Sequence, residues 1–194
     1  MRHLSASGKS VLLCAVAVAA LAGCAGPTVV QKPLVAQAPE WVNKGSGAFK
    51  DATGGDIFYG VGMASGIKNR ALAVTAADDR ARAEVAKVMN TYVAALTKSY
   101  MASTTAGDMS KSSEEQHVES TMKTFAQFTL HGAVIIDHYK DDSDGTLFSL
   151  CRLDLQAVKK SLDNAKELDS KVRDYVRTNA EKAFDDLQGE AAKH

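Results

Sequence analysis

The chain has 194 residues, of which 45% are hydrophobic, and its 23 Lys and Arg balance its 23 Asp and Glu. This length allows one compact domain with a tether. The charge balance argues against nucleic acid as the main partner, because domains that bind nucleic acid usually carry a basic excess.

The first 23 residues have the composition of an export signal. A short positive segment that contains Arg2 and Lys9 precedes an apolar run over residues 11–22. That run is too short to span a bilayer comfortably, which takes about 20 apolar residues. The sequence Leu21–Cys24, Leu-Ala-Gly-Cys, closes the segment and resembles the lipobox of bacterial lipoproteins.

This resemblance implies cleavage between Gly23 and Cys24, attachment of a diacylglycerol to the Cys24 sulfur, and fatty acylation (palmitate, for example) of the new amino terminus. Two or three acyl chains would hold the protein in a membrane almost permanently. Because Ala25 rather than aspartate follows the cysteine, the enterobacterial sorting rule favours the outer membrane of a Gram-negative-type bacterium. The alternative is a buried hydrophobic N-terminal helix that contains Cys24.

Removal of residues 1–23 leaves 21 Lys and Arg against 23 Asp and Glu, a formal charge of −2. This weak charge argues against electrostatic membrane binding, so the lipid must supply the attachment. Cys14 is lost with the signal and Cys24 is alkylated, which leaves Cys151 without a disulfide partner. We expect Cys151 to be buried in a strand as a small apolar residue.

All three prolines lie between Ala25 and Pro39, which predicts an extended tether over residues 24–39. Trp41, the only tryptophan, is expected to pack on the domain and fix the chain where the tether ends. A role for Trp41 as a ligand platform is the alternative.

Residues 54–66 are predicted to form a strand framed by glycines. Alternation places Ile57, Tyr59, Val61 and Met63 on one face, and Phe58, Gly60, Gly62 and Ala64 on the other. The small residues of the second face would let a helix approach closely.

Residues 69–101 contain neither Gly nor Pro and many alanines, which predicts a helix of about 30 residues. The charged residues are expected on a solvated face, with the ion pairs Asp78–Arg82 and Asp79–Arg82. The predicted apolar stripe consists of Leu72, Ala76, Val85, Val88, Met89, Tyr92, Leu96 and Tyr100.

A second helix is predicted over residues 112–130, with Val118, Met122 and Phe125 on its apolar stripe. Two β-rich runs, residues 131–140 and 146–155, flank an Asp-Gly turn and predict a β-hairpin.

Three residues of this hairpin region, His131, Asp137 and His138, invite a metal interpretation. Asp137 and His138 are adjacent, so a strand directs them to opposite faces. We therefore expect no metal site here. The alternative to a metal-binding role is that these histidines simply titrate on the protein surface.

The last segment repeats apolar residues with the period of a helix from Leu155 to Leu187, and residues 156–188 lack Gly and Pro. A continuous helix of this length would extend about 50 Å. Its second half is expected either to pack on a second protomer or another protein, or to bend back onto its own domain.

Several of these segments together resemble the LPP-twenty-type family of bacterial outer-membrane lipoproteins, over most of residues 39–163. They are the lipobox, "PEWV", "GDIFYGVGMASG", the alanine-rich helix and "HGAVIIDHYKDDSDGTLFSLCRLDLQAV". The resemblance implies a small lipid-anchored α+β domain of the kind known as surface antigens. One relative is a flagellar outer-membrane-associated lipoprotein that assembles around the motor. The family implies no catalytic residues.

We therefore predict an α+β fold in which a small antiparallel sheet packs on helices, in the order strand, long helix, second helix, hairpin and C-terminal helix. The predicted divisions are a signal peptide (1–23), a lipidated cysteine with its tether (24–39), the α+β domain (40–163) and a C-terminal helix (164–194) as a candidate oligomerisation segment.

The favoured function is a structural or interaction role in the cell envelope, through self-assembly or docking on an envelope complex. The alternative is a binding module for a small apolar or cell-wall ligand. An enzyme is disfavoured because the sequence contains neither a GxSxG nor an HExxH motif. Accordingly we expect no catalytic residue and no cofactor.

Overall fold

The computed structural model describes residues 35, 37–104, 112–166 and 168–191. Two units divide the chain, Met1–Lys32 and Pro33–His194, and the second holds the whole described core. The second unit has the size of a domain that folds independently. It is an α+β domain with a small antiparallel sheet, as predicted, and its described residues form five α-helices and four strands.

The sheet has the strand order β1-β2-β4-β3, and every neighbouring pair is antiparallel. Its strands are β1 (Gly47–Lys50), β2 (Asp56–Ala64), β3 (Val134–Lys140) and β4 (Leu147–Asp154). The predicted strand is β2, and the predicted hairpin is β3 with β4. The four residues of β1 were not predicted, because so short a run shows no alternation of its own.

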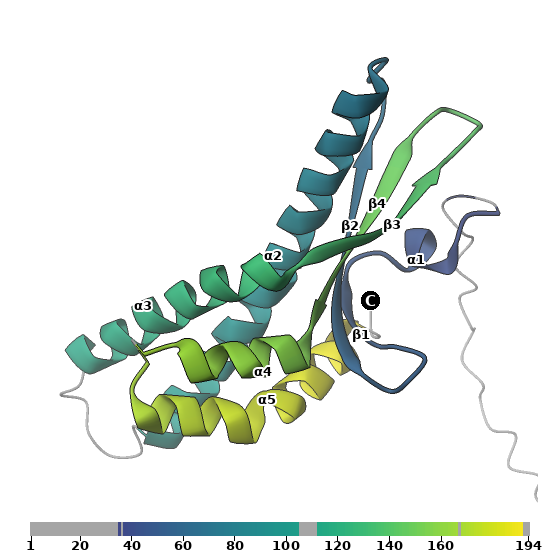
Figure 1. Ribbon diagram of the computed structural model, residues 1–194. Helices are drawn as coiled ribbons and strands as arrows, with labels where there is room; N and C mark the ends of the chain where they lie inside the picture. The colour runs from purple at the N-terminus through teal and green to yellow at the C-terminus, as the bar shows by residue number, and fades with distance from the viewer. Residues whose placement is uncertain (1–34, 36, 105–111, 167, 192–194) are drawn as a thin grey trace, which may run out of the picture. The chain divides into compact units, whose positions relative to one another are not determined.

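The helices are α1 (Glu40–Lys44), α2 (Arg70–Thr104), α3 (Ser112–Thr129), α4 (Leu155–Asn164) and α5 (Ser170–Ala191), with a short 3₁₀ turn at Leu130–Gly132. In Figure 1, α2 runs along the sheet, and α3, α4 and α5 lie around the C-terminal half of α2. The predicted helix at 112–130 is confirmed as α3. The short helix α1 was not predicted.

The long helix α2 lies against the small face of β2, as the glycine pattern predicted. A methyl group at Gly60 would lie 2.2 Å from the Ala81 carbonyl oxygen, and one at Gly62 would lie 2.2 Å from the Ala77 carbonyl oxygen. Backbone therefore touches backbone at these two positions, which only glycine permits.

This close approach selects alanines, rather than the predicted Leu72, for burial on the first half of α2. Leu72 is 58% exposed, whereas Ala77 and Ala81 are fully buried. Farther along, where α2 leaves the glycines, the predicted Val85, Met89, Tyr92 and Leu96 are buried as expected.

Three aromatic rings join α2, β2 and α5 at the centre of the core. The ring centroid of Phe58 lies 5.1 Å from those of Tyr92 and Phe184, in edge-to-face arrangements. The Tyr92 hydroxyl donates a hydrogen bond of 3.1 Å to the Ala180 carbonyl oxygen, and burial raises the pKa of this phenol.

Of the two expectations for the C-terminal segment, the structure shows the bend back onto its own domain: the helix ends at Asn164 and a new one begins at Ser170. Asp169 starts the new helix, since its Oδ1 accepts a hydrogen bond from the Lys171 N–H at 2.8 Å. Ala165 and Leu168 are buried in the turn between the two helices. The apolar residues of α5, including Val172, Val176 and Phe184, lie in the core of this same chain.

The opposite face of the sheet carries α1. Trp41 Nε1 donates a hydrogen bond of 2.9 Å to Asp137 Oδ2, and Lys44 Nζ lies 4.6 Å from the ring centroid of Phe49. Val42 is buried beside them. Trp41 therefore fixes the chain on the domain, as predicted.

The turn between β1 and β2 depends on the carboxylate of Asp51. Its Oδ1 accepts hydrogen bonds from the Thr53 hydroxyl (2.7 Å), the Gly55 N–H (2.8 Å) and the Thr53 N–H (2.9 Å). Its Oδ2 lies 3.2 Å from Arg152 Nη2. The Thr53 hydroxyl and the Gly55 N–H lower the pKa of Asp51, and Arg152 adds to the effect.

Because the pKa of Asp51 is lower in the folded chain than in the unfolded one, its contribution to stability is present above about pH 4 and lost as the pH falls through the folded pKa. We expect Asp51→Asn to be less stable than the wild type at pH 7, and the difference to shrink towards pH 3. Urea denaturation at a series of pH values measures it. Asp142→Asn, at a side chain that is 95% exposed, is the control. A difference independent of pH would contradict this expectation.

Candidate functional site

The predicted cleavage and lipidation residues, Gly23 and Cys24, lie outside the described residues, as does most of the tether. No helix among residues 35–104, 112–166 and 168–191 is both long and apolar enough to cross a membrane. The candidate sites that the structure itself presents are therefore a polar cluster, a buried thiol, a groove and a cavity.

The polar cluster joins α2 to β3 and β4. Asp78 Oδ1 accepts a hydrogen bond from the Ser149 hydroxyl at 2.7 Å and lies 2.7 Å from His138 Nε2. Asp78 was predicted on the solvated face with Arg82 as a partner, yet its carboxylate is only 19% exposed and bonds to the sheet. Of the two predicted pairs, Asp79–Arg82 is observed at 3.9 Å.

Ser149, His138 and Asp78 are the three residue types of a hydrolase catalytic triad, but the order in which they are hydrogen-bonded is different here. In a triad the imidazole takes the proton of the serine hydroxyl, and the carboxylate holds the far side of the imidazole. Here the hydroxyl of Ser149 and the imidazole of His138 both meet the same oxygen of Asp78. Ser149 is also fully buried, so its oxygen is closed to a substrate. The cluster fastens α2 to the sheet.

The candidate metal ligands His131, Asp137 and His138 are not brought together. Asp137 bonds to Trp41 on the face of the sheet that carries α1, while His138 bonds to Asp78 on the face that carries α2. His131 lies in the 3₁₀ turn that precedes β3. Within the part of the chain that the structure describes, no three His, Cys, Asp or Glu residues could hold a metal ion together.

Cys151 is fully buried in β4, as predicted. Burial raises the pKa of its thiol, and this outweighs the favourable effect of Arg82. A buried thiol with a raised pKa stays protonated at neutral pH and is a poor nucleophile. Cys151 therefore serves as a small core residue against Gly60, its partner across the β2–β4 pair.

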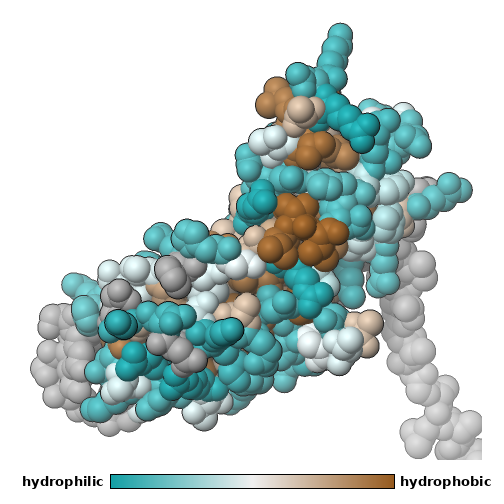
Figure 2. All heavy atoms as spheres, in the orientation of Figure 1, coloured by the Kyte–Doolittle hydropathy of each residue, from teal (hydrophilic) through white to brown (hydrophobic). Residues whose placement is uncertain are grey.

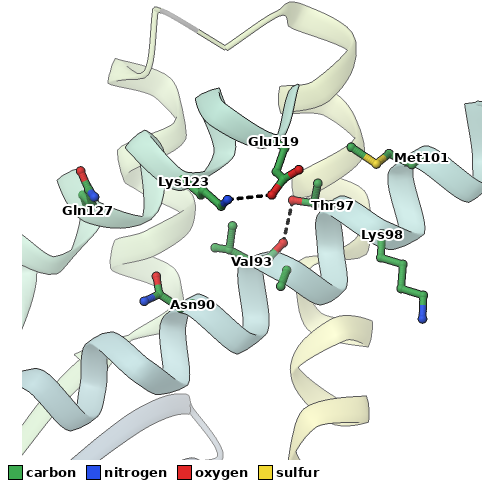
Figure 3. A pocket seen from close by; sticks show the side chains of 9 residues that line it. Asn90, Val93, Thr97, Lys98, Met101, Glu119, Lys123 and Gln127 are labelled. Atoms are coloured by element: carbon green, nitrogen blue, oxygen red, sulfur yellow. Dashed lines mark hydrogen bonds and ion pairs between the residues drawn. The ribbon is translucent and has the colours of Figure 1, made fainter. Parts of the chain in front are cut away.

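A groove of about 620 Å³ opens between α2 and α3 (Figure 3). Six residues of α2 between Asn90 and Met101 line it, together with Glu119, Lys123 and Gln127 of α3. These positions recur every three or four residues, as one face of each helix requires. The helical spacing in the sequence thus defines each of the two faces, but only the tertiary structure shows that they lie opposite each other.

The floor of this groove is apolar and its rim is polar. Val93 and Thr97 are almost fully buried, and the Thr97 hydroxyl donates its hydrogen bond to the Val93 carbonyl oxygen at 2.8 Å. On the rim, Lys123 Nζ lies 2.7 Å from Glu119 Oε1, whereas Lys98 points away from α3 (Figure 3). Because the polar groups of Thr97 and Glu119 are already paired, the groove suits an apolar surface or ligand.

No protein-family model matches this chain, and a search of curated proteins finds no match. The resemblance to LPP-twenty-type lipoproteins therefore stands on the sequence motifs alone.

Proposed function

We propose that this chain is a lipid-anchored lipoprotein of the outer membrane, with a structural or interaction role in the cell envelope. The observation that carries the proposal is the sequence Leu21–Cys24 at the end of an apolar run of signal length. The LPP-twenty-type resemblance supports the same class of protein and a role in an assembly such as that around a flagellar motor.

The geometry of the domain supports an interaction role more than catalysis. The one cluster of Ser, His and Asp described above is arranged as a structural link, and the thiol of Cys151 is buried. The α2–α3 groove offers an apolar floor with open access, of the kind that a helix or loop of a partner can enter. A second copy of the chain or another envelope protein would be that partner.

The anchor is tested by replacing each signal-region cysteine in turn. We expect Cys24→Ala to abolish incorporation of a labelled fatty acid and to release the protein from the membrane fraction, because the acylated sulfur is lost. Cys14→Ala, a matched change ten residues earlier, should leave both unchanged. Metabolic labelling and fractionation of inner and outer membranes measure the result. Labelled Cys24→Ala protein, or wild-type protein that retains residues 1–23, would contradict the proposal.

A second candidate function is the binding of a small apolar ligand in the α2–α3 groove. Its volume of about 620 Å³ lies in the range of small-molecule sites, which are mostly apolar with a few polar groups. Native mass spectrometry of protein extracted from its own envelope separates the two functions. A small molecule that is retained, and lost in Ala94→Trp, favours the binding module, whereas retained protein partners favour the interaction role.

A further inference from the structure

A second cavity, distinct from the α2–α3 groove, lies where β2 passes into α2 beside the β3–β4 turn. It has a volume of about 420 Å³, and we call it the tip cavity. Four basic residues line it, namely Lys68, Arg70, His138 and Lys140, and no carboxylate does. The remainder of its wall is mostly apolar and includes Ile67, Val74 and Leu147.

The basic residues of the tip cavity differ in whether an internal partner neutralises them. His138 is held by Asp78, and Lys140 Nζ lies 3.4 Å from the Asp142 carboxylate. Lys68 and Arg70, in contrast, form no hydrogen bond or ion pair with any residue that the structure describes. Two positive charges on one wall are therefore available to a ligand.

The carboxylates of the β3–β4 turn keep their negative charge, but the contacts they make are not with these two cations. In the β3–β4 turn, Asp141 accepts a hydrogen bond from the Ser143 N–H at 2.8 Å, and Asp144 accepts one from the Thr146 N–H at 2.8 Å. Asp142 is 95% exposed and directed to Lys140. The first turn of α2, where Arg70 lies, contains no acidic residue.

An exposed apolar side chain follows this cationic wall closely in the sequence. Leu72, in the first turn of α2 and two residues after Arg70, is 58% exposed. Figure 2 shows hydrophobic residues among hydrophilic ones at the upper end of the domain, where α2 begins. Cations beside exposed apolar groups are the combination found on protein surfaces that contact lipid headgroups.

We propose that the tip cavity binds the phosphate headgroup of an anionic phospholipid. Lys68 and Arg70 would donate hydrogen bonds to the phosphate oxygens, and the guanidinium of Arg70 can do so with two N–H groups. Ile67, Val74 and Leu147 would contact the apolar part of the same lipid. This contact is separate from the lipid on Cys24. It depends on a local pair of cations, so it would give the domain an affinity for an anionic membrane surface that the net charge of −2 alone does not predict.

The test uses the chain without residues 1–32, so that no lipid anchor contributes and the whole compact unit is retained. Co-sedimentation is measured with phosphatidylcholine vesicles and with vesicles that also hold phosphatidylglycerol. We expect binding to the anionic vesicles only, and weaker binding as salt is added. Lys68→Gln/Arg70→Gln should lower the affinity about 30-fold, the factor that two basic residues supply at an anionic surface.

The control is Lys160→Gln/Lys171→Gln, which removes the same charge from exposed positions of α4 and α5. It should keep its affinity within about twofold if the lipid binds in the tip cavity, because its lysines lie outside that cavity. Nonspecific attraction, which depends on net charge, would instead weaken both double variants equally. Val74→Trp, which keeps the charge but fills the cavity, should weaken binding, with thermal melting used to confirm that it is folded. Equal losses in both double variants, equal binding to both kinds of vesicle, or equal affinity for inorganic phosphate alone would overturn the proposal.

Discussion

Replacement of Gly62 by alanine is expected to destabilise the domain by at least about 3 kcal/mol, the upper range for overpacking in a closed core. The added methyl group would lie 2.2 Å from both the Ala77 carbonyl oxygen and the Ala81 nitrogen. These are backbone atoms of a 35-residue helix, so they cannot rotate away as a side chain would. The helix must instead move off the sheet and lose contacts along its buried face.

Chemical denaturation of the chain from residue 33 measures this change. Gly189→Ala is the matched control, because the same substitution on α5 meets nothing within 4 Å. It should stabilise the domain by about 0.5 to 1 kcal/mol, since alanine favours the helix more than glycine does. Similar stabilities for Gly62→Ala and the wild type would show that α2 does not touch β2 backbone to backbone.

Replacement of Phe184 by alanine is expected to cost about 3 to 5 kcal/mol, the usual range for removing a buried phenyl ring. The ring is fully buried, and its centroid lies 5.1 Å from that of Phe58 on β2. Its loss leaves a cavity between α5 and the sheet and removes the edge-to-face contact. This substitution tests whether α5 belongs to the core of its own chain.

The control for Phe184 is Leu72→Ala, a large apolar residue of α2 that is 58% exposed. Because little apolar surface is lost there, the free energy of unfolding should change by no more than about 0.5 kcal/mol. Light scattering should be run beside the denaturation curves. A Phe184→Ala protein of unchanged stability but altered oligomeric state would contradict the packing of α5 in its own domain. It would favour the alternative in which α5 packs on a second protomer.

Local sequence patterns predicted those helices and strands in which apolar or small residues repeat with the period of the element itself. The alternation in β2, the Asp-Gly turn of the β3–β4 hairpin and the alanine-rich α2 all depend on neighbours in the sequence, so the sequence alone reveals them. The burial of Cys151 follows in the same way from its place in an apolar strand.

The errors lie where a distant segment decides which side chain is buried. Leu72 was predicted in the apolar stripe but is exposed, because the glycines of β2 bring small alanines, not leucine, against the sheet. Asp78 was predicted on the solvated face but is mostly buried, because Ser149 and His138 of the sheet bond to its carboxylate. The signal for the break after Asn164 was present in Asp169 as a helix cap, but the unbroken apolar period concealed it.

By itself, the sequence determined the elements with internal periodicity and supplied the motif at Leu21–Cys24 on which the proposed function rests. Only the tertiary structure decided that the C-terminal segment folds back on its own domain, that α2 and α3 enclose a groove, and that Lys68 and Arg70 line a cavity with Lys140. The physical reason is that periodicity and turn chemistry act between near neighbours, whereas grooves, cavities and shared burial arise between residues that are far apart in the chain.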